Sequence, residues 1–170
     1  MPIRRITKHG ETILKTACPP LDYEAFKPEL PALLKDMWAT MRAARGVGLA
    51  APQIGLSLRV AVIDVRPEGK SHQLVLINPE IVSLEGDLND EEGCLSLPGI
   101  YAKLQRRARA RVRALDEHGE PWEATGEGLL ARAFQHEIDH LDGRLYVDRL
   151  PFEERLKVLD AIKDAKLGWD

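Results

Sequence analysis

The chain has little cysteine, little net charge and no long apolar run. Only two cysteines, Cys18 and Cys94, occur among 170 residues, so a disulfide framework is not expected, although the sequence does not exclude a single disulfide. No window approaches the length of an apolar membrane span, and the basic N-terminus is not followed by an apolar signal segment. We therefore expect a cytoplasmic protein with no membrane contact.

The charge balance and the organisation of the chain are also informative. The net charge is −3 and the pI is near 6.0, whereas a general phosphate-binding surface would make the balance basic. No specific nucleic-acid recognition is therefore expected. The sequence shows no internal repeat, low-complexity segment or linker, and its hydrophobic content of 44% is ordinary. These features predict a single domain over residues 1–170.

The most informative segment is residues 135–143, which read Gln-His-Glu-Ile-Asp-His-Leu-Asp-Gly. His136 and His140 are four residues apart, so on a helix their imidazoles lie on one face, with Glu137 beside the first. Two imidazoles suit zinc, iron, cobalt or nickel, and an adjacent carboxylate can take a proton from water that the metal has acidified. The segment predicts a hydrolytic metal site on a helix over residues 128–141.

Other interpretations of this helix are open. It could be a surface helix with two solvated histidines, or it could carry a core pair with protein partners. Leu129 and Ala133 fall on the same helical face as His136 and His140, which favours a buried face. A catalytic site also needs a third protein ligand. Cys94 could supply a thiolate, but a lone cysteine is not diagnostic.

Residues 46–55 form a glycine-rich segment, Gly-Val-Gly-Leu-Ala-Ala-Pro-Gln-Ile-Gly. It is not a dinucleotide fingerprint, because the third glycine is misplaced, and it is not a phosphate loop, because it lacks the lysine. A buried turn is the simplest interpretation. Gln53 would then need hydrogen-bond partners, and its amide could donate to an oxyanion.

The remaining pattern predicts an irregular arm, two helices and four strands. Residues 1–28 should be irregular, residues 31–44 helical, residues 58–65 and 74–82 strands, and residues 85–90 a polar turn region. Arginines at every second position over 106–115 predict a strand with one solvated face, paired with a strand through Trp122; RNA contact is the alternative. A last helix opens at Pro151 and should pack on the sheet through Phe152, Leu156, Leu159 and Ile162.

Taken together, residues 46–53, 92–96 and 135–140 resemble the three motifs of peptide deformylase, in the same order and at similar separations. The similarity extends over almost the whole chain. It implies an α+β fold: a small single domain with antiparallel or mixed sheets around a central metal-binding helix, plus N-terminal and C-terminal helices. The implied activity is hydrolytic removal of the N-formyl group from the formylmethionine of newly made polypeptides, with release of formate.

The resemblance also implies a role for particular residues. Cys94, His136 and His140 would bind one divalent ion, first of all Fe(II), with zinc, nickel or cobalt as alternatives. Glu137 would be the general acid and base for a metal-bound hydroxide. The formyl oxygen would be bound by the Gln53 amide and the Leu95 backbone N–H. Residues in contact with the substrate, each with core packing as its alternative, would be Val47, Gly48, Gly93, Leu97, Leu129 and Ala133.

Two further residues match positions near the metal in this family. Glu92 and Arg106 would orient the ligands, although a surface ion pair is the competing interpretation. The chain departs from many relatives in lacking a proline before Arg106 and in having a short closing helix, which leaves a transient ribosome contact open. We expect a monomer that acts on N-formylmethionyl peptides.

Two other functions have to be weighed against deformylation. A zinc endopeptidase shares the His-Glu-x-x-His helix, but its third ligand lies downstream and is not an upstream cysteine. A non-catalytic metal-binding or ribosome-associated module would have no use for a base such as Glu137 beside the metal.

Overall fold

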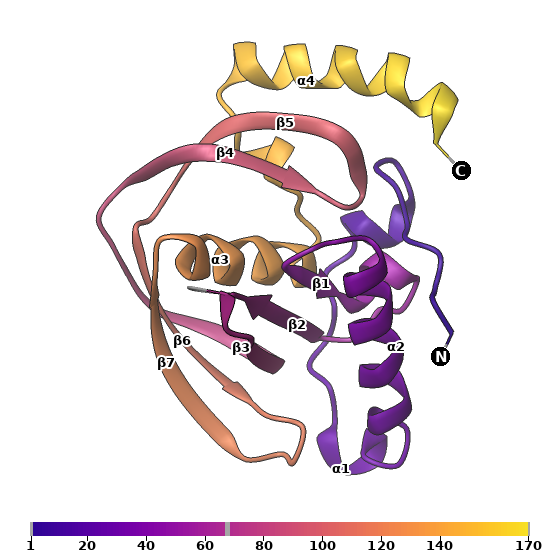
Figure 1. The fold of residues 1–170 in the computed structure, drawn as a ribbon, viewed down its shortest axis with the longest axis vertical. Helices are drawn as coiled ribbons and strands as arrows, with labels where there is room; N and C mark the ends of the chain where they lie inside the picture. Colours follow the sequence, from indigo (N-terminus) through magenta and orange to yellow (C-terminus); the bar gives the residue numbers. More distant parts are fainter. Residues whose placement is uncertain (1, 67–68, 170) are drawn as a thin grey trace.

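The computed structural model describes residues 2–66 and 69–169 (Figure 1). The strands are β1 (Gly48–Ala50), β2 (Val60–Val65), β3 (His72–Glu85), β4 (Leu88–Cys94), β5 (Leu97–Arg106), β6 (Arg109–Leu115) and β7 (Pro121–Glu127). The α-helices are α1 (Tyr23–Phe26), α2 (Leu30–Ala43), α3 (Leu129–Leu141) and α4 (Phe152–Ala165). Short 3₁₀ helices are η1 (Thr12–Lys15), η2 (Ala51–Ile54), η4 (Tyr146–Arg149) and η5 (Lys166–Gly168).

Two antiparallel sheets enclose helix α3. The larger sheet has the strand order β1-β2-β3-β6-β7, and the smaller sheet is the β4–β5 hairpin. In Figure 1, α3 lies between the two sheets, α2 lies beside β1 and β2, and α4 lies over the hairpin. The expected α+β class with a central helix is confirmed. No helix within the described residues is long and apolar enough to cross a membrane.

Helix α3 is amphipathic in a way that explains its central position. Phe134, Ile138 and Leu141 are buried against the larger sheet, where they pack in one cluster with residues of β2, β3 and β6. The helix begins after Gly128 and is followed by Gly143, and both glycines have positive φ, at 58° and 78°. Because one side of α3 faces the sheet, the opposite side, which carries the histidines, faces the hairpin.

The irregular N-terminal arm and the helix expected over residues 31–44, which is α2, are present. Within residues 2–28 the arm contains only η1 and the single turn α1. It is held by backbone hydrogen bonds such as Thr7 N–H to Gln53 O at 2.7 Å and Cys18 N–H to Leu141 O at 2.8 Å. Helix α2 packs its apolar stripe against β1 and β2. Cys18 and Cys94 are both free thiols, so the single bridge left open by the sequence is absent.

The β4–β5 hairpin was not anticipated, and of the expected polar turn over residues 85–90 only Gly86 and Asp87 lie outside strands. Strand β4 starts at Leu88 and is polar and mostly exposed through Glu91, so it lacks the apolar alternation that marks a strand. Strand β5 does bury Leu97, Ile100 and Leu104, but at uneven spacing. Because the hairpin has few buried apolar positions, its sequence lacks the hydrophobic alternation from which strands are predicted.

The expected apolar stripe of the last helix is only partly correct. Phe152 is 74% exposed and Leu156 is 46% exposed, whereas Val158 and Ile162 are buried, with Leu159 partly buried beside them. The helix therefore packs through a neighbouring face. It lies on β5 of the small hairpin and does not lie on the larger sheet (Figure 1).

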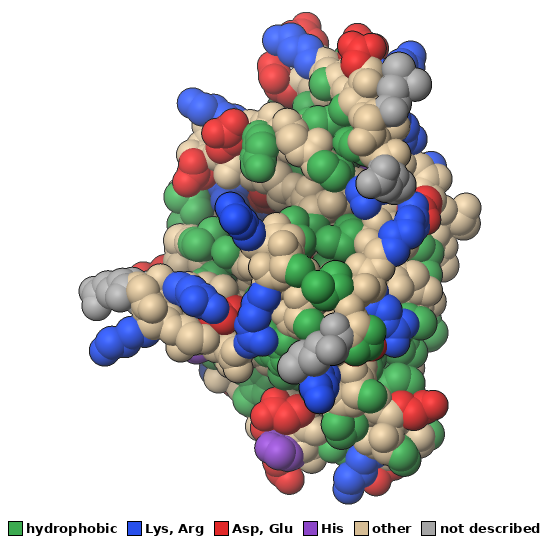
Figure 2. All heavy atoms as spheres, turned by 45° about the vertical axis from the view of Figure 1, so that its right-hand side comes forward, with side chains coloured by type: hydrophobic (Ala, Val, Ile, Leu, Met, Phe, Trp, Pro, Cys, Tyr) green, Lys and Arg blue, Asp and Glu red, His purple; other side chains and the backbone are tan. Residues whose placement is uncertain are grey.

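The arginine-rich strand β6 has the solvated face that the sequence predicted. Its arginines are exposed while Ala110, Val112 and Ala114 are buried. Arg109 and Arg111 pair across the sheet with acidic residues of β7, at 3.7 and 3.2 Å. The positive charge of Arg109 and Arg111 is thus balanced locally. The face shown in Figure 2 carries charged side chains of both signs among apolar ones.

Candidate active site

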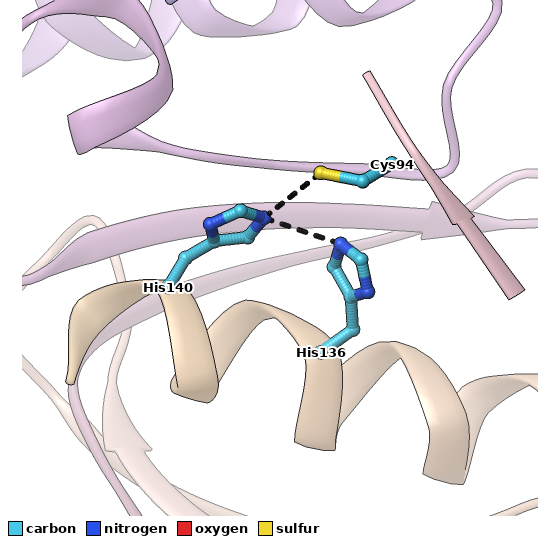
Figure 3. Close-up of side chains that lie close together, drawn as sticks. All are labelled: Cys94, His136 and His140. Carbon is cyan, nitrogen blue, oxygen red and sulfur yellow. Dashed lines mark hydrogen bonds between the residues drawn. The ribbon is translucent and has the colours of Figure 1, made fainter. Parts of the chain in front are cut away.

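Two histidines from α3 meet a cysteine from the end of β4 (Figure 3). His136 and His140 project from the same face of the helix toward Cys94. The His140 Nε2 atom is 3.3 Å from Cys94 Sγ and 3.2 Å from His136 Nε2. One potential ligand atom from each residue lies within 4.8 Å of the other two. The helix places two donors by its own periodicity, and the hairpin brings the third.

These donors fit a divalent transition metal. Bond lengths of about 2.0–2.1 Å for Zn–N and about 2.3 Å for Zn–S put neighbouring atoms of a tetrahedral site roughly 3.3–3.6 Å apart. The observed separations of 3.2 and 3.3 Å are close to this range. Imidazole and thiolate together suit iron or zinc. The surface-helix interpretation is wrong, because His140 is 1% exposed.

Glu92 and Arg106 lie directly behind one of the histidines. His136 Nδ1 donates to Glu92 Oε2 at 2.7 Å, and Arg106 donates to both oxygens of the same carboxylate, through Nε at 3.0 Å and Nη2 at 2.6 Å. Burial by itself would raise the pKa of Glu92, but hydrogen bonds from His136 and Arg106 hold that pKa well below its usual range. The ionised carboxylate keeps the His136 proton on Nδ1, so the Nε2 lone pair faces the other two donors.

This arrangement decides between the two interpretations of Glu92 and Arg106. The two residues are 5% and 4% exposed, so the surface ion pair is wrong. Glu92 contacts His136 directly, and Arg106 is linked to His136 through Glu92, as orientation of the ligand requires.

Glu137 is buried in the wall of a cleft beside His136. Its Oε1 atom accepts no hydrogen bond from the described part of the protein, and its Oε2 atom lies against Gly48. Burial raises the pKa of Glu137 to about 7. A buried carboxylate oxygen on a cleft wall that accepts nothing from the described residues is placed to act on a molecule in that cleft.

Gln53 approaches the cysteine from the glycine-rich segment. Its Oε1 atom accepts the Ala50 N–H at 3.0 Å, which orients the amide. Its Nε2 atom donates to Ser96 Oγ at 3.1 Å and lies 3.6 Å from Cys94 Sγ. Leu95, the residue after the cysteine, lines the same cleft as Gln53. The structure therefore brings both expected oxygen-binding residues to the cleft beside Cys94.

A cleft of about 600 Å³ opens in front of these groups. Val47 and Leu129 lie at its edge with 42% and 55% of their surface exposed, so neither is simply packed in the core. The expected substrate-contacting residues that line the cleft are Val47, Gly48, Gly93, Leu129 and Ala133.

Leu97 is the exception among the expected substrate contacts. It does not line the cleft. It is 1% exposed and packs in the core beneath α4, in the cluster that contains Leu14 and Tyr146. Its side chain leaves β5 toward this core, so for Leu97 the alternative of core packing is correct.

Three charged residues near the site were not anticipated. Arg132 Nη1 donates to Glu92 Oε1 at 2.6 Å. Asp139 Oδ2 accepts from Arg106 Nη1 at 2.6 Å and from Arg149 Nε at 2.7 Å. Arg132 precedes His136 by four residues and Asp139 follows it by three, so both lie near it on the helix. A charged side chain on a helical face that is expected to be buried needs a partner. Arg132 and Asp139 on this face could therefore have indicated the charge cluster.

Cysteine and histidine donors next to a buried carboxylate, in an α+β frame, define a metal-dependent hydrolase. Residues 3–156 match a family model described as polypeptide deformylase. A peptide deformylase of Acidobacterium capsulatum is 48% identical, over 96% of this chain and 95% of the relative. Another, from Elusimicrobium minutum, is 41% identical over 99% of both chains. The chain belongs to the polypeptide deformylase family.

Solved structures agree with this assignment. The crystal structure of a peptide deformylase from Legionella pneumophila has a TM-score of 0.89 at 47% identity, covering 97% of this chain and 96% of that one. A peptide deformylase from Synechococcus elongatus in complex with actinonin has a TM-score of 0.87 at 37% identity, covering 100% of this chain and 90% of that one. The chain is thus a metal-dependent hydrolase that removes the N-formyl group from new polypeptides.

Proposed function

We propose that deformylation is carried out by Glu137, Gln53 and Leu95, with a divalent ion held by Cys94, His136 and His140. The supporting observation is the convergence of one sulfur and two Nε2 atoms beside a buried carboxylate oxygen that accepts nothing from the described protein. This arrangement provides for proton transfer at the point where the donors meet.

The reaction adds water to the formyl carbon, breaks its bond to nitrogen, and releases formate and a free amine. When bound, the divalent ion supplies Lewis acidity, which lowers the pKa of water and polarises the formyl oxygen. Glu137 accepts the proton that the attacking water loses and returns it to the departing nitrogen. Its position on the cleft wall lets one carboxylate serve both transfers.

The formyl oxygen gains negative charge as water adds. The Gln53 side-chain N–H and the Leu95 backbone N–H donate to it. Gln53 is held by its bonds to Ala50 and Ser96, so little reorganisation accompanies the reaction. Each donor of this kind is worth about 3 kcal/mol of transition-state stabilisation.

The cleft recognises the residue that bears the formyl group. Val47, Leu129 and Ala133 provide apolar surface for a methionine side chain, and the backbones of Gly48 and Gly93 run beside the peptide. Burying such a side chain contributes about 1.5–3 kcal/mol, which ranks substrates without excluding other apolar residues. Formylmethionyl peptides are therefore the substrate class.

Fe(II) is the ion that we propose, and zinc, nickel and cobalt are the alternatives. The mixed thiolate and imidazole set supports a first-row transition metal of this group. Metal analysis of anaerobically purified protein, with a formate assay on the same sample, should show activity that follows iron content. Full activity in a preparation that contains only zinc would overturn the choice of iron.

The activity itself is tested with two substrates. Formyl-Met-Ala should release formate, and an unblocked peptide with internal bonds should stay intact; internal cleavage without formate release would favour the endopeptidase. Glu137→Gln should reduce formate release by at least about 10²-fold. The matched control is Glu127→Gln, which alters an exposed carboxylate just before the same helix and should leave the rate unchanged.

The cellular setting is part of the proposal. Because the substrate is a new polypeptide, the protein acts in the cytoplasm as a monomeric single domain over residues 1–170, in transient contact with the ribosome. Light scattering should give the mass of one chain. Co-sedimentation with ribosomes at low salt should show weak, reversible binding, and its absence would remove the ribosome contact.

A further inference from the structure

We propose that Arg149 is a positioning residue of the metal site, acting on His136 through a chain of buried charges that runs through Asp139, Arg106 and Glu92. The inference rests on the proposed role of His136 as a ligand. Arg149 itself lies at the end of η4, outside the metal-binding helix and away from the cleft.

Each link of the chain is a short hydrogen bond between charged groups. Arg149 donates two parallel hydrogen bonds to Asp139, from Nε to Oδ2 and from Nη2 to Oδ1, both 2.7 Å long. The same Oδ2 accepts Arg106 Nη1 at 2.6 Å. Arg106 donates to both oxygens of Glu92 through Nε and Nη2, and Glu92 accepts from His136 Nδ1 at 2.7 Å. Such two-pronged pairs fix orientation as well as distance.

Arg149 matters because Arg106 is shared between two carboxylates. Glu92 and Asp139 are both nearly inaccessible to solvent, so neither can replace a lost partner easily with bulk water. With Arg149 present, each Asp139 oxygen accepts a hydrogen bond from Arg149, and Oδ2 accepts a second one from Arg106. Without it, Asp139 is free to turn and to take more of the Arg106 guanidinium. The two hydrogen bonds from Arg106 to Glu92 would then weaken, and Glu92 would hold the His136 imidazole less firmly.

The two ligand imidazoles differ in how they are held. His136 Nδ1 is bonded to Glu92, whereas His140 Nδ1 is buried and has no hydrogen-bond partner within residues 2–66 and 69–169. Orientation of an imidazole ligand by a carboxylate therefore operates on His136 alone in this part of the protein. Any loosening of the chain that starts at Arg149 falls on that ligand.

Arg149 can be replaced without opening the core, since its side chain is 42% exposed. The test uses Arg149→Gln, with Co(II) binding to the metal-free protein measured by competition with a chelator. We expect affinity to fall about tenfold, as is typical when a group behind a ligand is removed. The visible Co(II) spectrum should change, while the melting temperature of the metal-free protein changes little. Arg149→Lys keeps the charge but cannot make two parallel hydrogen bonds to Asp139, so its Co(II) affinity should lie between those of the wild type and Arg149→Gln.

The matched control is Arg59→Met. Arg59 also pairs with an acidic residue at the end of α3, Asp142, at 2.9 Å, but it has no link to Glu92. Its Co(II) affinity and spectrum should equal those of the wild-type protein. The inference is overturned if Arg149→Gln binds Co(II) with unchanged affinity and spectrum, or if Arg59→Met loses as much.

Two further variants separate this inference from the proposed function. If His136→Ala binds Co(II) as the wild type does, the ligand assignment fails. If His136→Ala is impaired but Arg149→Gln is not, only the inference about Arg149 fails. In an Asp139→Asn background, Arg149→Gln should add little further loss of affinity, because the effect of Arg149 passes through that carboxylate.

Discussion

Replacing Gly48 by alanine should displace the base without removing it. An alanine Cβ at this position would be 2.5 Å from Glu137 Oε2 and 2.9 Å from its Cδ, whereas ordinary contacts begin at 3.4 Å. Gly48 has no positive φ, so its backbone accepts alanine, and the carboxylate must move by about 0.9 Å. A displacement of about 1 Å in a reacting group can cost about 10²-fold in rate. We expect kcat to fall by about this factor.

The assay is formate release from formyl-Met-Ala under saturating substrate, with metal content measured on the same sample. Gly126→Ala is the control, because its Cβ would meet Leu130 Cγ at 2.6 Å, a similar clash near the start of the same helix but remote from Glu137. It should reduce stability and leave kcat close to wild type. If Gly48→Ala changed KM alone, or left the rate intact, the carboxylate would not be acting from the position described.

Three other substitutions probe the site and the fold. Gln53→Ala should lower kcat by roughly 10²–10³-fold with metal content unchanged, because one donor to the formyl oxygen is lost; a change in metal content alone would contradict that role. Cys94→Ser should sharply weaken metal binding in a chelator competition, and unchanged affinity would remove this residue from the ligand set. Ile162→Ala should cost about 2–4 kcal/mol in urea unfolding, whereas Phe152→Ala should cost less than about 0.5 kcal/mol; the reverse order would mean that α4 packs through the other face.

The part of the site that sequence could predict is the part set by local geometry. A four-residue spacing places His136 and His140 on one side of any α-helix, and the structure has them there. The meeting with Cys94 is a tertiary event across 42 residues, and no periodicity encodes it. The resemblance of the motifs suggested that contact, and the structure brings the residues within range.

The last helix shows why periodicity alone could not predict the rest. Of the expected stripe, Phe152 and Leu156 are exposed, Leu159 is partly buried and Ile162 is buried, and Val158 packs in the same cluster as Ile162. Val158 and Leu159 are neighbours in sequence, so their side chains lie about 100° apart around the helix axis. Both directions carry apolar side chains, and the choice depends on the surface available beneath, which the β4–β5 hairpin provides. Because that hairpin was itself not predicted, the buried face of α4 could not be predicted either.

The charge cluster behind the ligands is better explained by orientation than by stability. Glu92 and Asp139 accept hydrogen bonds from Arg106, Arg132 and Arg149, and all but the last are nearly fully buried. Buried ion pairs often stabilise a protein no more than apolar side chains of similar volume would, because desolvation offsets their attraction. Apolar side chains, however, could not hold an imidazole proton on Nδ1. The cluster therefore makes sense as a means of presenting His136 Nε2 to the metal, and folding free energy and metal affinity should respond differently when its members are changed.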